Sequence, residues 1–165
     1  MARPQPDFTA LFYESLGGQP EPIRYKLREG PCLLHDIAFL NSLIHDARVM
    51  NPGVDVANGT LSLHVNRDCW EYGYTRKHDA LELHIANASI DIAGVVSSRW
   101  IFAGTPVVEP WIDFLWFCRS YLSHRTTNFE AILAGEHWEC RLVLDREAWS
   151  LELRDEETPH LFGRH

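Results

Sequence analysis

The sequence predicts an α+β fold, with a mainly antiparallel sheet of about seven to nine strands and two main helices, over residues 32–47 and 110–124. Three observations support this expectation. Short segments with alternating apolar and polar residues recur along the chain, one segment has apolar residues at helical spacing, and another begins with a proline and is apolar nearly all round. With 165 residues, 45% of them hydrophobic, the chain is expected to form a single globular domain over residues 1–165.

The first third predicts two short strands and then the first helix. Residues 8–13 and 23–27 have strand-like composition, and each segment is followed by glycine and proline residues that end it. Pro31 suits the first turn of a helix, and Asn51-Pro52-Gly53 marks a turn after it. The apolar positions that recur at intervals of four and three residues are Leu33, Ile37, Leu40, Ile44 and Ala47.

The middle of the chain predicts β structure. Apolar and polar residues alternate over 61–65, and a return strand is expected over 69–74. Segments 81–86 and 90–92 also alternate. If Asn87-Ala88 is a two-residue loop, every apolar side chain of this hairpin lies on one face, and His84 lies directly opposite Asp91.

Segment 110–124 is interpreted as the second helix. Pro110 suits its first position, Asp113 lies in its first turn, and basic residues follow at its far end. Trp111 and Trp116 would lie about 140° apart around the helix axis, so both cannot face the same sheet. We therefore expect part of this segment to contact a second layer or a partner, and the candidate interface residues are Trp111, Trp116 and Phe117.

Further strands are expected over 99–103, 138–144 and 149–153, and residues 155–165 are interpreted as an acidic, flexible C-terminal tail.

The sequence also contains a weak internal repeat. Leu63–Trp70 and Leu142–Trp149 share the pattern Leu-x-apolar-(Asn/Asp)-Arg-acid-small-Trp at an offset of 79 residues. The repeat indicates either an old duplication or two turns that share the same chemistry.

Composition excludes several classes of function. Fifteen Lys and Arg against 23 Asp and Glu give a net charge of −8, which argues against nucleic-acid binding and favours basic partners. The sequence has no apolar run long enough to span a membrane and no secretory signal pattern. The four cysteines are widely spaced, which is typical of reduced thiols in a cytoplasmic protein.

The histidines supply weak candidates for catalysis. His84 and Asp91 would form a cross-strand pair, with His64 on a neighbouring strand, and a carboxylate beside an imidazole can orient it for acid–base work or metal binding. An ordinary cross-strand pair on a solvated face is the simpler interpretation. Common catalytic and nucleotide-binding motifs are absent from the sequence, so no cofactor or metal site is predicted.

The leading functional hypothesis is a cytoplasmic binding or regulatory protein that acts through a protein partner or as a homo-oligomer, because segment 110–124 is so apolar. Two alternatives stay open. One is a small metal- or His-dependent enzyme that uses His64, His84 and Asp91. The other is a carbohydrate-binding module that stacks a sugar on Trp70 or Trp100.

Overall fold

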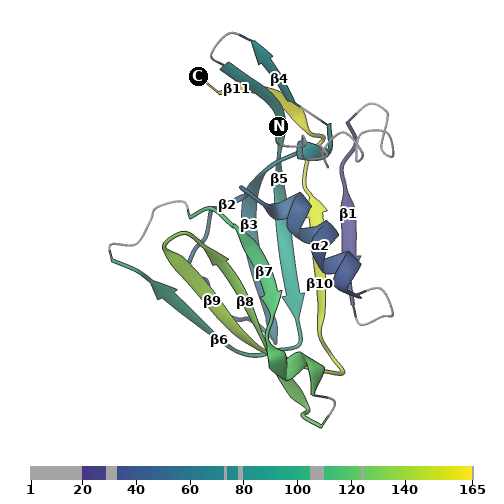
Figure 1. Ribbon diagram of the computed structural model, residues 1–165, viewed down its shortest axis with the longest axis vertical. Helices are drawn as coiled ribbons and strands as arrows, with labels where there is room; N and C mark the ends of the chain where they lie inside the picture. The colour runs from purple at the N-terminus through teal and green to yellow at the C-terminus, as the bar shows by residue number, and fades with distance from the viewer. Residues whose placement is uncertain are drawn as a thin grey trace, which may run out of the picture.

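The computed structural model describes residues 20–28, 33–72, 74–77, 80–104, 110–123 and 125–164. In this part of the chain, eleven strands form two antiparallel sheets, and α2 (Leu33–Ile44) is the one α-helix (Figure 1). The helix expected over 32–47 is therefore present within slightly narrower bounds. The helix expected over 110–124 is not, and the strand expected over 8–13 lies outside the described residues.

The larger sheet has seven strands and is built around β5 (Ala80–Ala93). β10 and β11 pair with successive parts of one edge of β5, and β3 and β4 pair with parts of the other edge. β1 then pairs with β10, and β2 pairs with β3. The remaining bounds are β1 Arg24–Leu27, β2 Arg48–Val49, β3 Thr60–Asp68, β4 Tyr74–Lys77, β10 Ser150–Asp155 and β11 His160–Arg164.

The smaller sheet has four strands in the order β6-β9-β8-β7, so β7 and β6 are its edge strands. Short 3-10 turns follow β3 and β7. The bounds are β6 Val95–Phe102, β7 Phe114–Phe117, β8 Asn128–Gly135 and β9 Trp138–Asp145, with turns η1 Trp70–Tyr72 and η2 Arg119–Leu122.

Two of the places that join the two sheets show how the sheets are held together. At Gly94 the chain passes directly from β5 to β6, and this residue has φ +73°, a backbone conformation that favours glycine. At the other junction, the backbone before β7 pairs with the backbone before β2. There the Ile112 N–H donates to the Ala47 carbonyl at 2.8 Å, and the Asp46 N–H donates to the Ile112 carbonyl at 2.9 Å.

One hydrophobic core lies between the sheets and beneath α2. Alternate residues of β3, β5 and β10 face those of β8 and β9, as expected for two packed sheets. Figure 1 shows α2 lying across strands of the larger sheet, and the helix packs against β1, β3 and β7. Residues that α2 contributes to the core are Ile37, Leu40, Leu43 and Ile44.

The helix expected over 110–124 is wrong because the segment has the burial period of a strand. Leu115 is 1% exposed, whereas its neighbours Phe114 and Trp116 are 45% and 61% exposed. Phe-Leu-Trp-Phe has high strand propensity, and pairing with β8 places Trp116 opposite Ile132. An apolar run of this length fits either period, and the long-range pairing decides between them.

The hairpin expected around Asn87-Ala88 is also wrong. β5 runs straight through these residues because β3 covers one edge of the strand there and β10 covers the other. His84 and Asp91 consequently belong to one strand, seven residues apart, and project from opposite faces.

Two further expectations need correction. Residues 160–164 of the proposed flexible tail form β11, which pairs with residues 81–85 of β5. The internal repeat has no matching topology, because the segment that leads to Leu63–Trp70 contains α2, whereas the segment that leads to Leu142–Trp149 contains β7 and β8. The two copies do not share a turn either, because residues 66–68 lie within β3, whereas residues 146–148 form the turn between β9 and β10.

Candidate functional site

The structure separates the three weak catalytic candidates. His64 lies opposite Ser89, on the same face of the sheet as Asp91, and its Nδ1 is 3.6 Å from a carboxylate oxygen of Glu156. His84 lies on the other face, where its ring meets the edge of Tyr72 at a centroid distance of 5.9 Å. The described residues therefore do not assemble a His84–Asp91 pair.

His84 instead lies near a buried ionic network. Arg67, which is fully buried, follows Leu63 and Val65 on the inner face of β3. Its Nε donates to Asp155 Oδ1 at 2.7 Å, and its Nη2 donates to Asp155 Oδ2 at 2.8 Å and to Glu71 Oε1 at 2.6 Å. We call Arg67, Glu71 and Asp155 the Arg67 triad.

The Arg67 triad ties together segments that are distant in sequence. Asp155 at the end of β10 also accepts a hydrogen bond from the Ile23 N–H at 2.9 Å, and Glu71 belongs to η1. Although burial by itself lowers the pKa of Arg67, its hydrogen bonds to Asp155 and Glu71 raise that pKa above the ordinary value. The network therefore links β3, η1, β10 and the residue before β1 through buried ionic contacts and hydrogen bonds.

A group of exposed apolar side chains lies on β7, on η2 and just before β7. Of the large hydrophobic side chains that are exposed, Trp111, Phe114, Trp116 and Leu122 belong to residues 111–122. Trp116 is 61% exposed and Leu122 is 72% exposed. Trp111 is partly covered, because the Arg48 guanidinium carbon lies 5.4 Å from the centre of its ring.

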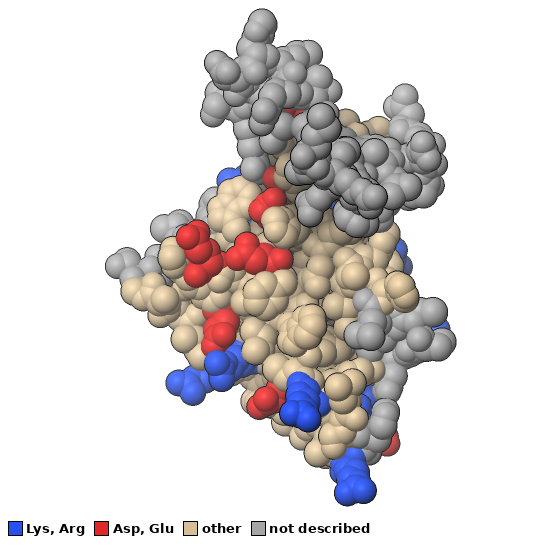
Figure 2. All heavy atoms as spheres, in the orientation of Figure 1, with Lys and Arg blue, Asp and Glu red and all other residues tan. Residues whose placement is uncertain are grey.

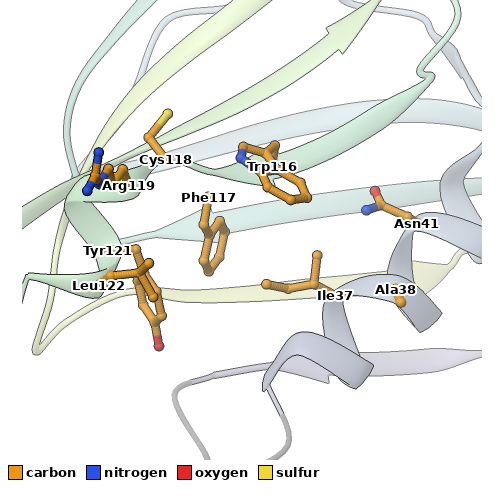
Figure 3. A pocket seen from close by; sticks show the side chains of 9 residues that line it. All are labelled: Ile37, Ala38, Asn41, Trp116, Phe117, Cys118, Arg119, Tyr121 and Leu122. Carbon is orange, nitrogen blue, oxygen red and sulfur yellow. The ribbon is translucent and has the colours of Figure 1, made fainter.

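A mainly apolar pocket of about 380 Å³ opens beside Trp116, between α2 and the β7–η2 segment. This volume falls in the range of ligand-binding pockets, roughly 300–1,000 Å³. In Figure 3, Ile37 points from α2 toward Phe117, and the ring of Tyr121 lies beside that of Phe117, with ring centroids 5.2 Å apart. We call it the β7 pocket, and its lining residues are Ile37, Ala38, Asn41, Trp116, Phe117, Cys118, Arg119, Tyr121 and Leu122.

Asn41 fixes the helical wall of the β7 pocket. Its Nδ2 donates to the Leu115 carbonyl at 3.0 Å, and its Oδ1 accepts from the Leu115 N–H at 2.7 Å. The amide thus satisfies the backbone of an edge strand, as a neighbouring strand would. This contact holds α2 and β7 at a fixed separation.

Arg146 fixes the opposite wall. Its guanidinium lies beneath η2 and donates to four backbone carbonyls at 3.0 to 3.1 Å. Its central carbon is also 5.4 Å from the ring centre of Tyr121, which lines the pocket. The four acceptors are the carbonyls of Ser120, Tyr121, Ser123 and Thr126.

Cys118 is the one thiol that lines the β7 pocket, and burial raises its pKa above the ordinary value. Figure 3 shows its sulfur pointing away from Phe117. Cys69, Cys118 and Cys140 are all free in the structure, and Cys32 lies outside the described residues. A neutral thiol is a weak nucleophile, so the site favours binding over covalent chemistry.

Within the described ranges, no group of three or more His, Cys, Asp or Glu side chains is placed to hold a metal ion. None of the helical structure described is long and apolar enough to cross a membrane. Comparison with known proteins found no matching family model, no similar curated protein and no similar solved structure.

Of the three interface candidates from the sequence, Trp116 and Phe117 line the β7 pocket. Trp111 does not line it and instead contacts Arg48 and Trp138. That these residues contact a partner stays a prediction. Trp70 and Trp100, the candidates for sugar stacking, are half-buried. Trp100 stacks on Trp138 at a centroid distance of 5.5 Å. The sequence did not indicate that α2 forms part of the pocket, because Asn41 binds Leu115, which is 74 residues away in the chain.

Proposed function

We propose that this protein is a polypeptide-binding protein whose partner inserts an apolar side chain into the β7 pocket. The observation that carries the proposal is the exposed indole of Trp116 at the rim of an apolar pocket of about 380 Å³. Aromatic side chains beside such pockets are typical centres of binding energy, because covering them removes a large apolar area from water.

The walls of the pocket support this function because hydrogen bonds within the chain hold them in place. Asn41 fixes α2 against β7, and Arg146 fixes η2 through four backbone carbonyls. A preformed pocket loses less conformational entropy on binding than one that must be ordered by the partner. The rigid scaffold therefore favours recognition of a side chain.

The contact with Asn41 also determines how a partner can dock. Leu115 uses both its backbone N–H and its carbonyl on Asn41, so a partner strand cannot pair with β7 at this residue. We therefore propose insertion of a side chain, flanked by contacts to Trp116 and Phe114, and not the addition of a strand. A cytoplasmic location stays a prediction from the sequence.

Chemical-shift titration of the ¹⁵N-labelled protein with minimal probes tests the proposal. N-acetyl-leucinamide and N-acetyl-tryptophanamide are expected to shift the amides of Ile37, Phe117 and Tyr121, whereas N-acetyl-glycinamide leaves them unchanged. Binding in the millimolar range, roughly −4 kcal/mol, is expected for probes this small. The absence of any saturable shift with either apolar probe would refute the proposal.

Two variants localise the effect. Trp116→Ser removes the exposed indole and is expected to weaken binding, whereas Val96→Ser removes an apolar side chain that is 57% exposed on β6. The second variant should bind like the parent protein. Light scattering on the same proteins shows whether the chain forms a homo-oligomer. If the parent protein is a dimer and Trp116→Ser is a monomer, the partner is a second copy of this chain.

A further inference from the structure

We infer that the partner of the β7 pocket carries acidic residues next to the apolar side chain that it inserts. This inference rests on the proposed function and adds the charge of the partner. The inference differs from what the net charge of the whole chain suggests, because a net charge of −8 by itself favours basic partners. The local distribution of charge around η2 is the reason.

The pocket wall formed by β7 and η2 is locally basic. Residues 114–127 contain Arg119 and Arg125 and no Asp or Glu. Arg119 lines the pocket and is the one charged residue among its lining residues. Both arginines are exposed, and neither has an ion pair with any described residue.

Arg146 adds a third positive charge beneath the same turn. All four of its hydrogen bonds go to carbonyl oxygens, and within the described ranges it has no carboxylate partner. Carbonyl groups solvate the guanidinium but do not cancel its charge. The field of Arg146 therefore adds to that of Arg119 and Arg125.

Three arginines elsewhere in the described structure are paired with carboxylates. Arg67 is neutralised by two buried carboxylates, Arg24 pairs with Glu152, and Arg141 pairs with Glu139. Three carboxylates also belong to this region: Glu130 on β8, whose N–H donates to the Ser120 hydroxyl at 3.0 Å, Glu139 on β9, which pairs with Arg141, and Glu147, which follows Arg146. The charge that faces the pocket itself is that of Arg119, which lines it and has no carboxylate partner among the described residues.

The surface view agrees with this distribution. In Figure 2, most of the visible basic side chains lie toward the lower end of the molecule, where Figure 1 places η2; acidic side chains lie beside some of them and also above them. A guanidinium binds a carboxylate through two parallel hydrogen bonds, so Arg119 is suited to an Asp or Glu beside the inserted side chain. Opposite charges would also speed the encounter.

Three capped pentapeptides with one central leucine test the inference. In the first, the leucine is flanked by aspartates, in the second by asparagines and in the third by lysines. Affinities come from the shifts of Ile37, Phe117 and Tyr121, at about 20 mM and about 300 mM salt. At low salt we expect the aspartate peptide to bind about five- to tenfold tighter than the asparagine peptide. The lysine peptide should be weakest, and high salt should shrink these differences.

Variants assign the charge effect to the pocket. Arg119→Gln is expected to remove most of the preference for aspartate over asparagine, and the ratio of the two affinities, measured on the same variant, is the quantity compared. Arg99→Gln, at an exposed arginine on the far edge strand β6, is the matched control and should keep the full preference.

The outcomes separate this inference from the proposed function. Equal binding of the aspartate and asparagine peptides, or tightest binding of the lysine peptide, overturns the acidic partner while leaving side-chain insertion intact. If no leucine peptide and neither apolar probe binds, the proposed function itself fails. Octanoate that binds where the aspartate peptide does not would also overturn the inference, because the site would then recognise a small amphipathic anion.

Discussion

The side chain of Asn41 is hydrogen-bonded to both backbone groups of Leu115. Its Nδ2 lies 3.0 Å from the carbonyl oxygen, and its Oδ1 lies 2.7 Å from the backbone nitrogen. An asparagine amide carries the same donor and acceptor as a peptide group, so it can complete the edge of a strand. This single side chain joins the helix to the smaller sheet. It also closes the edge of β7 to strand pairing at Leu115 and sets the width of the β7 pocket.

Replacing Asn41 with aspartate tests the importance of this contact. A carboxylate can accept from the Leu115 N–H but offers no donor to the Leu115 carbonyl, which it repels. We expect Asn41→Asp to lower the free energy of unfolding by about 1–3 kcal/mol. Urea unfolding at neutral pH measures the change. Ser42→Ala, at an exposed position on the same helix, is the control, and equal losses for the two variants would contradict this account.

The Asn41–Leu115 contact illustrates what the sequence can predict. The helix over 33–44 follows from local apolar spacing, and the alternation in β3 and β9 follows from local pattern in the same way. β7 could not be assigned from local sequence, because its apolar run fits either a helix or a strand. Its pairing with β8 makes it a strand. Asn41 and Arg67 are ordinary polar residues in the sequence, and only partners 74 and 88 residues away give them their roles.

Arg67 can be tested by removing its charge. Arg67→Met leaves Glu71 and Asp155 buried without a cation, so we expect a loss of about 3–5 kcal/mol in the free energy of unfolding. Chemical denaturation with urea measures it. Arg24→Met removes a surface arginine that pairs with Glu152, and this control should leave the urea midpoint nearly unchanged. A small loss for Arg67→Met would show that the triad is not important for stability.

Thiol reactivity should follow burial. Burial raises the pKa of Cys140 to about 12 and raises the pKa of Cys118 as well, so both thiols are neutral at pH 7–8. In a Cys32→Ser variant we expect Cys118, the most accessible of the three described cysteines, to react first with iodoacetamide. Cys69 and Cys140 should react only after unfolding. Peptide mass spectrometry assigns the sites, and early labelling of Cys140 would contradict this order.

The raised pKa of Cys140 predicts a dependence of stability on pH. The pKa of Cys140 is higher in the folded protein than its ordinary value of 9.0, so the folded state holds this proton more tightly. Its contribution to stability is complete below pH 9 and is lost as the pH rises from 9 to about 12. A Cys140→Ala variant should therefore show a smaller loss of stability over this interval than the parent protein. Identical losses would exclude the effect.

Gly94 at the junction of β5 and β6 should not tolerate a side chain. Its φ is +73°, and a Cβ there would lie 2.6 Å from the backbone nitrogen of Trp149. Gly104 has φ +87° but nothing within 4 Å of a Cβ, so Gly104→Ala measures the cost of the backbone conformation alone, about 1–2 kcal/mol. We expect Gly94→Ala to cost more than Gly104→Ala in thermal or urea unfolding. Equal costs would show that the junction can relax.

Arg146 connects stability to binding. An ammonium group cannot reproduce the planar set of donors that reaches four carbonyls, so Arg146→Lys should loosen η2 while the two sheets stay folded. Hydrogen exchange at the amides of Tyr121 and Ser123 is expected to speed up about tenfold, equivalent to about 1.4 kcal/mol. The affinity for N-acetyl-leucinamide should fall in parallel, because Tyr121 and Leu122 line the pocket. Arg141→Lys keeps a surface pair with Glu139 and should change neither quantity. Faster exchange without weaker binding would separate the turn from the pocket.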